Sequence, residues 1–562
     1  MRIRKYVQRL TCLVVLLAGF HPAEAQEARN HNFDVAKNLE IFNAIYKNLD
    51  LLYVDTLNAS EVIGNGIDAM LRSLDPYTEY YPEEKQQELK WMLTGKYAGI
   101  GALVRYHKRL KRVVIDEPYE GMPAAEAGLC KGDIILQIDD TLMTDKTVSY
   151  VSSHLRGDAG TSFILRILRP ATGKEMKFKI TRRAIKTPEI PYYGMRENGV
   201  GYINLNTFSG EPSKPMRRAF VELKQQGARS LVLDLRGNGG GSLSECVDIV
   251  NMWVPKGITL VETRGKLKAA NTQYATRLEP VDTVMPIVVL VNGETASASE
   301  ITSGSLQDLD RGIILGTRTY GKGLVQRPDI TLPYNGNLKL TVSKYFIPSG
   351  RCIQAINYKH SGGGYREHVP DSLTHVFYTK RGREVRDGGG IKPDIELRPD
   401  TMANISLYLS RLDSTEVMFD YVVEYIAKHP SIASAADFRL SDADWQDFKQ
   451  RVIAAGFQYD QVSRRQFDEL VRVAKYEGYY DDASAEFAAL QSKLTHNVAR
   501  DLERNREEIT QILEQEIVSA YYYQAGALQL GLRYDKQLRE AERILSTAGE
   551  YERILSPQTA RQ

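Results

Sequence analysis

Apolar residues near the start of the chain recur every three or four positions, which is the spacing of one face of an α-helix. Leu39, Phe42 and Ile45 belong to such a series. After about residue 95 the pattern changes to short apolar runs, such as residues 113–115 (Val-Val-Ile), that are separated by glycine turns. We therefore expect amino-terminal helices followed by a β-rich region.

Between about residues 186 and 398 the apolar runs are continuous rather than alternating. Residues 230–235, 287–291, 312–316 and 338–342 are such runs, with glycine turns and helical stretches between them. A strand that is covered on both faces has this pattern, whereas a strand with one solvated face alternates. This region is thus predicted to be an α/β core.

Amphipathic helices are predicted from about residue 401 to 562. Ile405, Leu409 and Leu412 trace one apolar stripe, and Leu502 and Ile509 belong to another. Such stripes have to be buried against something. Two readings stay open: the stripes fill the inside of a helical domain, or they and the amino-terminal helices bury faces between the subunits of a homo-oligomer.

The first residues have the three parts of a secretory signal peptide. Residues 1–5 carry a positive cluster, residues 13–20 are apolar, and residues 23–25 (Ala-Glu-Ala) have the small residues of a cleavage site. The apolar run is shorter than the roughly 20 residues that a membrane span needs. We expect an exported protein, periplasmic or otherwise extracytoplasmic, with no transmembrane span after the signal is removed.

Composition excludes several classes of function. A chain of 562 residues is too long to fold around one hydrophobic core, so several domains are expected. A formal net charge of +2 provides no basic field for a nucleic-acid partner. The cysteines beyond the signal peptide, Cys130, Cys246 and Cys352, are an odd and scattered set, which argues against a disulfide framework. No cluster has the spacing of zinc ligands, so neither a metal nor a cofactor is expected.

Three segments of the predicted core carry candidate chemistry, and the first is residues 234–241 (Asp-Leu-Arg-Gly-Asn-Gly-Gly-Gly). Its glycines free backbone amides to point at a ligand oxygen, and the helix that follows adds positive potential. By itself the segment could be a flexible turn, or it could equally hold a phosphate.

The second segment, residues 295–301 (Thr-Ala-Ser-Ala-Ser-Glu-Ile), follows an apolar strand directly. A serine at such a junction is presented at the edge of the sheet, with the following N–H groups free for an oxyanion. Ser297 and Ser299 could also be simple helix caps. The third segment, residues 319–326, places Lys322 between two glycines after another strand, an odd position for a merely solubilising charge.

The β-rich region contains three motifs: residues 97–102 (Tyr-Ala-Gly-Ile-Gly-Ala), 122–129 leading to 131–135 (Lys-Gly-Asp-Ile-Ile), and 155–157 (Leu-Arg-Gly) before 160–161. With these motifs the region resembles a PDZ domain. The resemblance implies that the backbone N–H groups at Gly99, Ile100 and Gly101 bind a terminal carboxylate and that the ligand is added as an extra strand. Without the resemblance these glycines could simply make turns.

Together the three core segments resemble the carboxyl-terminal processing, or tail-specific, peptidase family, whose motifs they match in order and spacing. The resemblance implies a Ser/Lys dyad in which Ser297 is the nucleophile and Lys322, 25 residues further on, is its base. It also implies that Gln326 orients the lysine.

The same resemblance implies an oxyanion hole. One donor is the N–H of Ala298, and the other comes from the glycine-rich turn, where spacing leaves Gly240 and Gly241 as alternatives. Three further positions match the family and are interpreted as scaffold: Glu300, Asp308 and Arg236.

The chemistry of lysine agrees with this assignment. A free lysine has a pKa near 10.4, so a lysine base needs desolvation before it can act near neutral pH. The pattern Gly-x-Ser-x-Gly of a Ser-His-Asp hydrolase does not occur in the sequence, and none of the nine histidines falls in the three segments.

The sequence therefore predicts an exported serine endopeptidase that recognises the carboxyl termini of proteins or peptides through its PDZ-like domain. Two rivals are weighed against it: a catalytically inactive PDZ-bearing binding or scaffold protein, and an acyl-CoA enzyme on a related core. The predicted domains are a signal peptide (1–25), an amino-terminal helical region (26–94), a PDZ-like domain (95–185), a tail-specific peptidase core (186–400) and a helical carboxyl-terminal region (401–562).

Overall fold

The computed structural model describes residues 22–86, 89, 97–185, 188–355, 370–460, 462–494 and 497–557. Residues 1–21 of the predicted signal peptide lie outside the described residues, and its predicted cleavage point falls in the first turn of a helix that begins at Pro22. The chain divides into two compact units, residues 1–80 and 81–562.

The first unit contains two helices, α2 (Pro22–Leu52) and α3 (Ala59–Arg72). α3 begins where the Asn58 side chain accepts a hydrogen bond from the Glu61 N–H, as is typical of a helix cap. The predicted amino-terminal helices are thus confirmed. Several large apolar side chains of α2, among them Leu39, Phe42 and Ile45, are exposed. No helix among the described residues has the length and apolar character needed to span a membrane.

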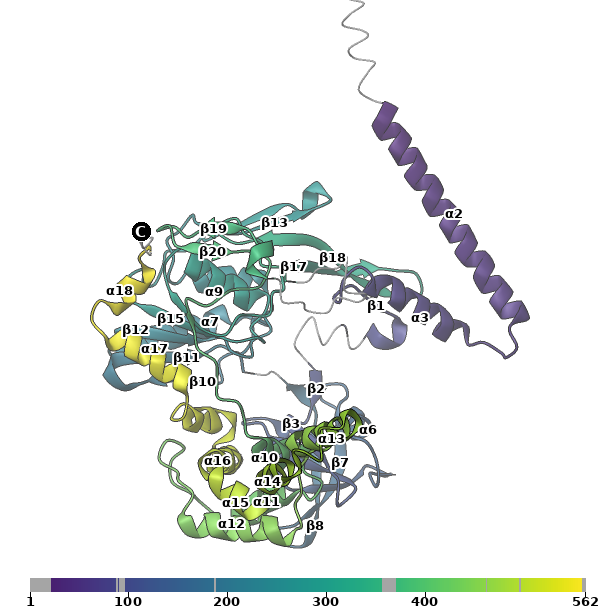
Figure 1. Ribbon diagram of the computed structural model, residues 1–562. Helices are drawn as coiled ribbons and strands as arrows, with labels where there is room; N and C mark the ends of the chain where they lie inside the picture. The colour runs from purple at the N-terminus through teal and green to yellow at the C-terminus, as the bar shows by residue number, and fades with distance from the viewer. Residues whose placement is uncertain are drawn as a thin grey trace, which may run out of the picture. The chain divides into compact units, whose positions relative to one another are not determined.

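The second unit starts with the predicted β-rich region, in which Figure 1 labels β3, β7 and β8. Its strands form an antiparallel sheet in the order β3-β4-β5-β7-β8. One face of this sheet packs with helices α5 and α6 around a core that includes Ile115, Ile135 and Leu165. The bounds are β2 (Tyr97–Gly99), β3 (Ala102–His107), β4 (Arg112–Pro118), α5 (Pro123–Glu126), β5 (Ile134–Ile138), β6 (Thr141–Leu142), α6 (Val148–Leu155), β7 (Ser162–Arg169), β8 (Lys174–Thr181) and β9 (Arg183–Ile185).

The α/β core is a sheet in the order β10-β11-β12-β15-β16-β21. The strands from β11 to β21 are parallel, and β10 is antiparallel to β11. The bounds are β10 (Tyr192–Met195), β11 (Val200–Asn204), β12 (Ser230–Asp234), β15 (Ile287–Val291), β16 (Ile313–Gly316) and β21 (Ile395–Glu396).

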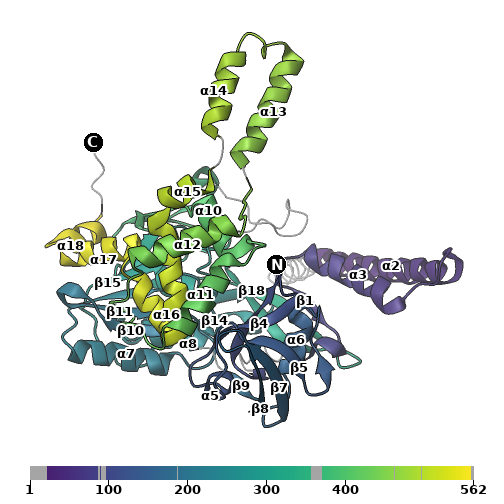
Figure 2. The ribbon, with the colours of Figure 1, turned by 90° about the horizontal axis from the view of Figure 1, so that it is seen from below.

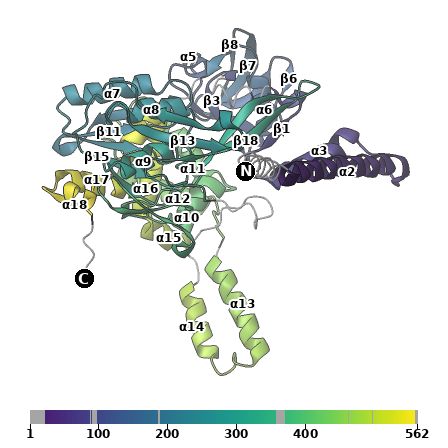
Figure 3. The same ribbon diagram turned by 90° about the horizontal axis from the view of Figure 1, so that it is seen from above.

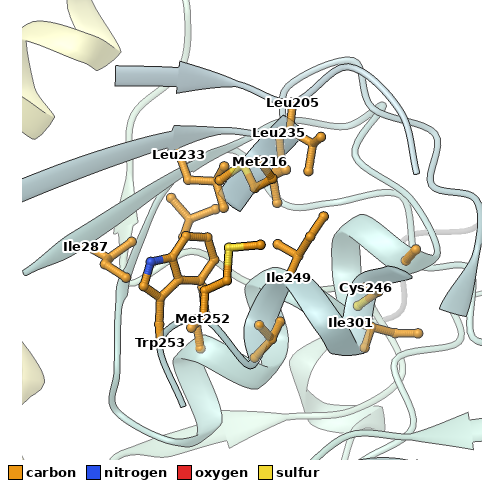
Figure 4. Close-up of a cluster of buried hydrophobic side chains, with 14 of the residues drawn as sticks. Leu205, Met216, Leu233, Leu235, Cys246, Ile249, Met252, Trp253, Ile287 and Ile301 are labelled. Atoms are coloured by element: carbon orange, nitrogen blue, oxygen red, sulfur yellow. The ribbon is translucent and has the colours of Figure 1, made fainter. Parts of the chain in front are cut away.

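Helices cover both faces of this core sheet. On one face, α7 (Ser213–Gln225), α8 (Leu243–Val250) and α9 (Ala298–Asp308) bury their side chains against the strands. Figure 4 shows Leu233 and Ile287 of the sheet beside Trp253 in this layer. On the other face lie α17 (Lys536–Ser546) and α18 (Glu550–Leu555), which come from the predicted carboxyl-terminal helical region. This double cover explains why the core strands read as continuous apolar runs.

A second sheet of the core contains β13 (Thr259–Gly265), β14 (Thr272–Ala275), β17 (Leu324–Thr331) and β18 (Asn337–Phe346). The predicted apolar run 338–342 forms part of β18, but its residues are only half-buried. It therefore differs from the other predicted runs, whose side chains are fully buried in the parallel sheet. The short pair β19 (Val376–Tyr378) and β20 (Glu384–Arg386) follows.

The remaining helices pack on one another and bury most of the predicted stripes internally. Ile405, Leu409, Leu502 and Ile509 are buried in one cluster, whereas Leu412 is exposed. The helices α13 and α14 form a hairpin that projects from this cluster (Figures 2 and 3). The bounds are α10 (Asn404–Leu407), α11 (Val417–Lys428), α12 (Asp442–Ala454), α13 (Val462–Glu477), α14 (Ser484–Leu494), α15 (Val498–Arg504) and α16 (Arg506–Gly531).

The helical region also covers the outer face of the β3–β8 sheet. Val114 of β4 packs against Phe419 and Val423 of α11. Nearby, the buried Lys131 ammonium lies 2.8 Å from a carboxylate oxygen of Asp116 and 2.8 Å from one of Glu516, which belongs to α16. Breaking a buried ion pair leaves an uncompensated charge, so this contact fixes the two regions to each other.

Candidate active site

The three segments singled out in the sequence follow β12, β15 and β16, which are neighbours in the parallel sheet. The carboxyl ends of parallel strands meet at one edge of a sheet, where ligands of α/β proteins bind. Hydrogen bonds join the segments directly: the Ala296 N–H donates to the Asn238 carbonyl, and the Tyr320 N–H donates to the Thr295 carbonyl, both at 3.0 Å. The structure thus brings all three segments together.

Ser297 immediately precedes α9 in an unusual backbone conformation, with φ of 58° and ψ of −117°. Only glycine adopts a positive φ without strain, so this serine conformation costs about 1–3 kcal/mol and requires support from its surroundings. A sharp turn between strand and helix exposes a serine hydroxyl above the end of a sheet, which is the geometry of a nucleophile.

Support for Ser297 comes from the carboxylate of Glu300, one turn into α9. One oxygen accepts hydrogen bonds from the N–H groups of Ser297 and Lys322, both at 2.9 Å, and the other accepts from Gly321 and from the Thr319 hydroxyl. Two bonds to a single oxygen place the amide nitrogens of Ser297 and Lys322 no more than about 6 Å apart.

Glu300 is fully buried, and this burial raises the pKa of its carboxyl to about 7, while the four donors act in the opposite direction by favouring the ionised form. An ionised carboxylate can accept all four hydrogen bonds, whereas a protonated carboxyl has to use one oxygen as a donor. The integrity of this network therefore depends on pH near neutrality.

Lys322 is half-buried in the loop between β16 and β17. Its carbonyl accepts a hydrogen bond from the Tyr345 hydroxyl, which also lies 3.3 Å from the carbonyl oxygen of Ser297. Gln326 lies on β17, where its side-chain amide donates to the Thr341 hydroxyl at 3.2 Å. Gln326 is thus in the strand that begins two residues after Lys322.

The glycine-rich turn lies against Ser297. A Cβ at Gly240 would come within 2.8 Å of the Ser297 Cβ and 2.9 Å of the Ala298 nitrogen, so only glycine fits there. The Gly240 N–H donates to the Asn238 side chain at 2.9 Å. Within the part of the chain that the structure describes, the N–H groups of Ala298 and Gly241 have no hydrogen-bond acceptor.

In the predicted carboxylate-binding segment, Gly99 ends β2, and Ile100 and Gly101 join β2 to β3. Gly101 has a φ of 69°, and a Cβ there would meet the Cβ of Met122 at 2.4 Å, so glycine is required. No acceptor for the N–H groups of Ile100 and Gly101 is found among the described residues. β3, which follows, is an edge strand of its sheet, and α6 lies beside it.

From the sequence alone, the role of Glu300 in the site is underestimated and that of Tyr345 is missed. Glu300 was interpreted as scaffold, yet the pattern Ser297-x-x-Glu300 is the signature of a capping box, in which a glutamate accepts from the N–H three residues earlier. That signal could have identified its contact with Ser297. Tyr345 was not singled out, and no local pattern in β18 points to it.

Family comparisons agree with this architecture. Peptidase family S41 matches residues 199–360, a range that contains both Ser297 and Lys322. A PDZ domain matches residues 114–169. A domain described as "Probable PDZ-protease, C-terminal helical domain" matches residues 408–545.

Among individual relatives, a "Carboxy-terminal-processing protease" of Bartonella bacilliformis is 34% identical over 331 residues, which are 58% of this chain and 75% of the relative. A "Probable CtpA-like serine protease" of Staphylococcus aureus is 32% identical over 327 residues, but the match spans only 64% of that relative and 57% of this chain. The solved structure of a photosystem II D1 C-terminal processing protease is 27% identical, with a TM-score of 0.35, and the match covers 62% of this chain and 84% of that one. The extent of the Bartonella match, together with the family matches, shows that the chain belongs to peptidase family S41, the carboxy-terminal processing serine proteases that carry a PDZ domain.

Proposed function

We propose that this protein is an exported serine endopeptidase in which Ser297 attacks the peptide bond and Lys322 is its general base. The observation that carries the proposal is the single Glu300 oxygen that binds the amides of both residues and thereby holds them side by side. A structural role alone would not require a serine with strained φ and ψ next to a lysine between two glycines.

In the proposed reaction the neutral Lys322 amine takes the proton of the Ser297 hydroxyl as its oxygen attacks the substrate carbonyl. The protonated lysine then returns this proton to the leaving amine, and water hydrolyses the acyl-enzyme. We assign the oxyanion hole to the N–H groups of Ala298 and Gly241. Gly240 is the less suitable alternative, because its N–H is already donated to Asn238. Gln326 orients Lys322 in this proposal.

Substrates are proposed to be proteins or peptides with a free carboxyl terminus. The N–H groups of the Gly99–Gly101 loop would bind the carboxylate, and the last residues would extend along the open edge of β3 beside α6. The PDZ domain would then gate or deliver the substrate to Ser297. A PDZ-bearing protein without catalysis is the alternative, and the presence of Ser297, Lys322 and Gln326 argues against it.

α2 exposes a row of large apolar side chains among the described residues. Because the carboxyl-terminal stripes are buried within the chain, we propose that the exposed face of α2 with Leu39, Phe42 and Ile45 forms the contact in a homo-oligomer.

Our first prediction concerns the dyad. Ser297→Ala and Lys322→Ala should each lower kcat at least about a thousandfold without loss of the fold, because nucleophile and base act as a unit. Ser303→Ala is the matched control, since Ser303 is a buried serine of the same helix whose hydroxyl bonds only within α9. Cut sites in a tagged protein substrate, mapped by mass spectrometry, give the readout. Full activity of the Ser297→Ala variant would refute the mechanism.

The second prediction is that activity and stability respond to pH in opposite directions. Activity should rise between about pH 6 and 9, because Glu300 must be ionised and Lys322 neutral. Glu300 has a folded pKa above its ordinary value of 4.5, so its contribution to stability is complete below pH 4.5. The free energy of unfolding should fall by on the order of 3 kcal/mol as the pH rises from 4.5 to about 7, because the buried carboxyl then loses its proton.

Denaturant unfolding at each pH measures the free energy of unfolding. In Glu300→Gln the decrease of this free energy between pH 4.5 and 7 that Glu300 causes should be absent. An activity maximum near pH 5 would contradict a lysine base.

The third prediction tests recognition of the carboxyl terminus. A fluorogenic peptide with apolar carboxyl-terminal residues should show at least about a tenfold lower kcat/KM after amidation of its terminus, because the loop amides lose a charged acceptor. The same peptide acetylated at its amino terminus is the control and should be cleaved unchanged. Equal cleavage of the amidated and free peptides would show that the PDZ domain does not read the carboxylate.

A fourth prediction concerns assembly. Light scattering of the mature protein should give a mass of more than one chain, and the double variant Phe42→Glu, Ile45→Glu should reduce it to a single chain. Leu267→Glu, at an exposed leucine of the other unit, is the control and should leave the mass unchanged. A single-chain mass for the unaltered protein across micromolar concentrations would exclude the oligomer.

A further inference from the structure

Tyr345 is a tyrosine of β18 that contacts both residues of the proposed dyad through one hydroxyl group. The hydroxyl donates to the carbonyl of Lys322 and lies 3.3 Å from the carbonyl of Ser297. Its backbone N–H also donates to the carbonyl of Gly323 at 3.0 Å. The same residue thus holds the lysine loop from its side chain and from its backbone.

The contacts of Tyr345 complement those of Glu300. Glu300 binds the amide nitrogens of Ser297 and Lys322, and Tyr345 approaches their carbonyl oxygens. Each of the two residues is therefore held on both sides of its α-carbon by the same pair of side chains. Fixing two such points determines where the Ser297 and Lys322 side chains start, and so how far apart their reactive atoms can lie.

Packing alone does not account for a tyrosine at this position. The side chain is 1% exposed, and its ring belongs to the hydrophobic cluster that also contains the side chains of α7, α8 and α9. A phenylalanine ring would fill the same space, whereas burying a hydroxyl costs free energy unless the group finds a hydrogen-bond partner. The Tyr345 hydroxyl reaches the carbonyls of Lys322 and Ser297, the two residues that the proposed chemistry uses.

We propose that Tyr345 is a positioning residue, whose hydroxyl fixes the Lys322 loop against Ser297 and keeps nucleophile and base at reacting distance. This inference rests on the proposed function for its effect on catalysis. Its effect on the backbone of Ser297 and of the Lys322 loop does not depend on the proposed function. The hydroxyl has one proton, so it forms its stronger bond to Lys322 and a weaker contact with Ser297.

The test is Tyr345→Phe, which removes the hydroxyl and keeps the ring. Tyr421→Phe is the matched control, because Tyr421 is also buried and donates to a backbone carbonyl, that of Asp444, in the helical region. With the fluorogenic peptide of free carboxyl terminus, Tyr345→Phe should lower kcat about tenfold to a hundredfold and leave KM within about twofold, because small misplacement of reacting groups has effects of this size. The control should leave both constants unchanged.

Hydrogen exchange provides a readout that does not depend on activity. In Tyr345→Phe the peptides that contain the amides of Ser297 and Lys322 should exchange faster, while thermal unfolding shifts by no more than in Tyr421→Phe. Unchanged exchange at both amides, or a kcat equal to that of the control in an active enzyme, would overturn the proposal. If the unaltered protein cleaves no peptide, the proposed function fails. Faster exchange at both amides in Tyr345→Phe would then still support the proposal that the Tyr345 hydroxyl fixes the Lys322 loop against Ser297.

Discussion

The carboxylate of Glu300 is buried beneath four donors from two loops, one ending at Ser297 and the other containing Thr319, Gly321 and Lys322. A carboxylate without solvent is stabilised only when its hydrogen bonds are complete. Displacing either loop would leave a buried charge with too few partners, so the two loops are held in place together. The strained backbone of Ser297 persists for the same reason, because the network that binds its N–H also fixes the lysine opposite.

The three segments of the candidate site could be found in the sequence because each follows a buried strand, whereas the roles of Ser297 and Lys322 came from the family resemblance. Continuous apolar runs identified β12, β15 and β16, and the carboxyl ends of such strands meet at one edge. The role of Glu300 was accessible through the local spacing of a capping box. Tyr345 was not, because its contact with Ser297 depends on how the second sheet packs on the first, and no periodicity within β18 encodes that packing.

The helical region shows the same limit at the level of the fold. Its stripes predicted helices correctly, but they could not show which surfaces the helices cover. α17 and α18 close the second face of the parallel sheet, while α11 covers the outer face of the β3–β8 sheet. A signal for the latter existed: residues 113–115 are all apolar, whereas an antiparallel strand with one solvated face alternates. Val114, the middle residue, points to α11.

The side chains of β3 alternate between the core of the PDZ domain and the helical region. Val104 and Tyr106 pack toward the core of the PDZ domain, whereas Arg105 and His107 form pairs with Glu416 and Asp420 at 2.5 and 3.0 Å. The helical region thus contacts this strand through the side chains of Arg105 and His107, and Glu416 also accepts a hydrogen bond from the backbone N–H of Lys108, which follows the strand. Backbone groups along the open edge of β3 stay available, and they are the groups that an added strand uses. In the proposed mode of binding, a ligand strand at this edge would leave the side-chain contacts Arg105–Glu416 and His107–Asp420 in place.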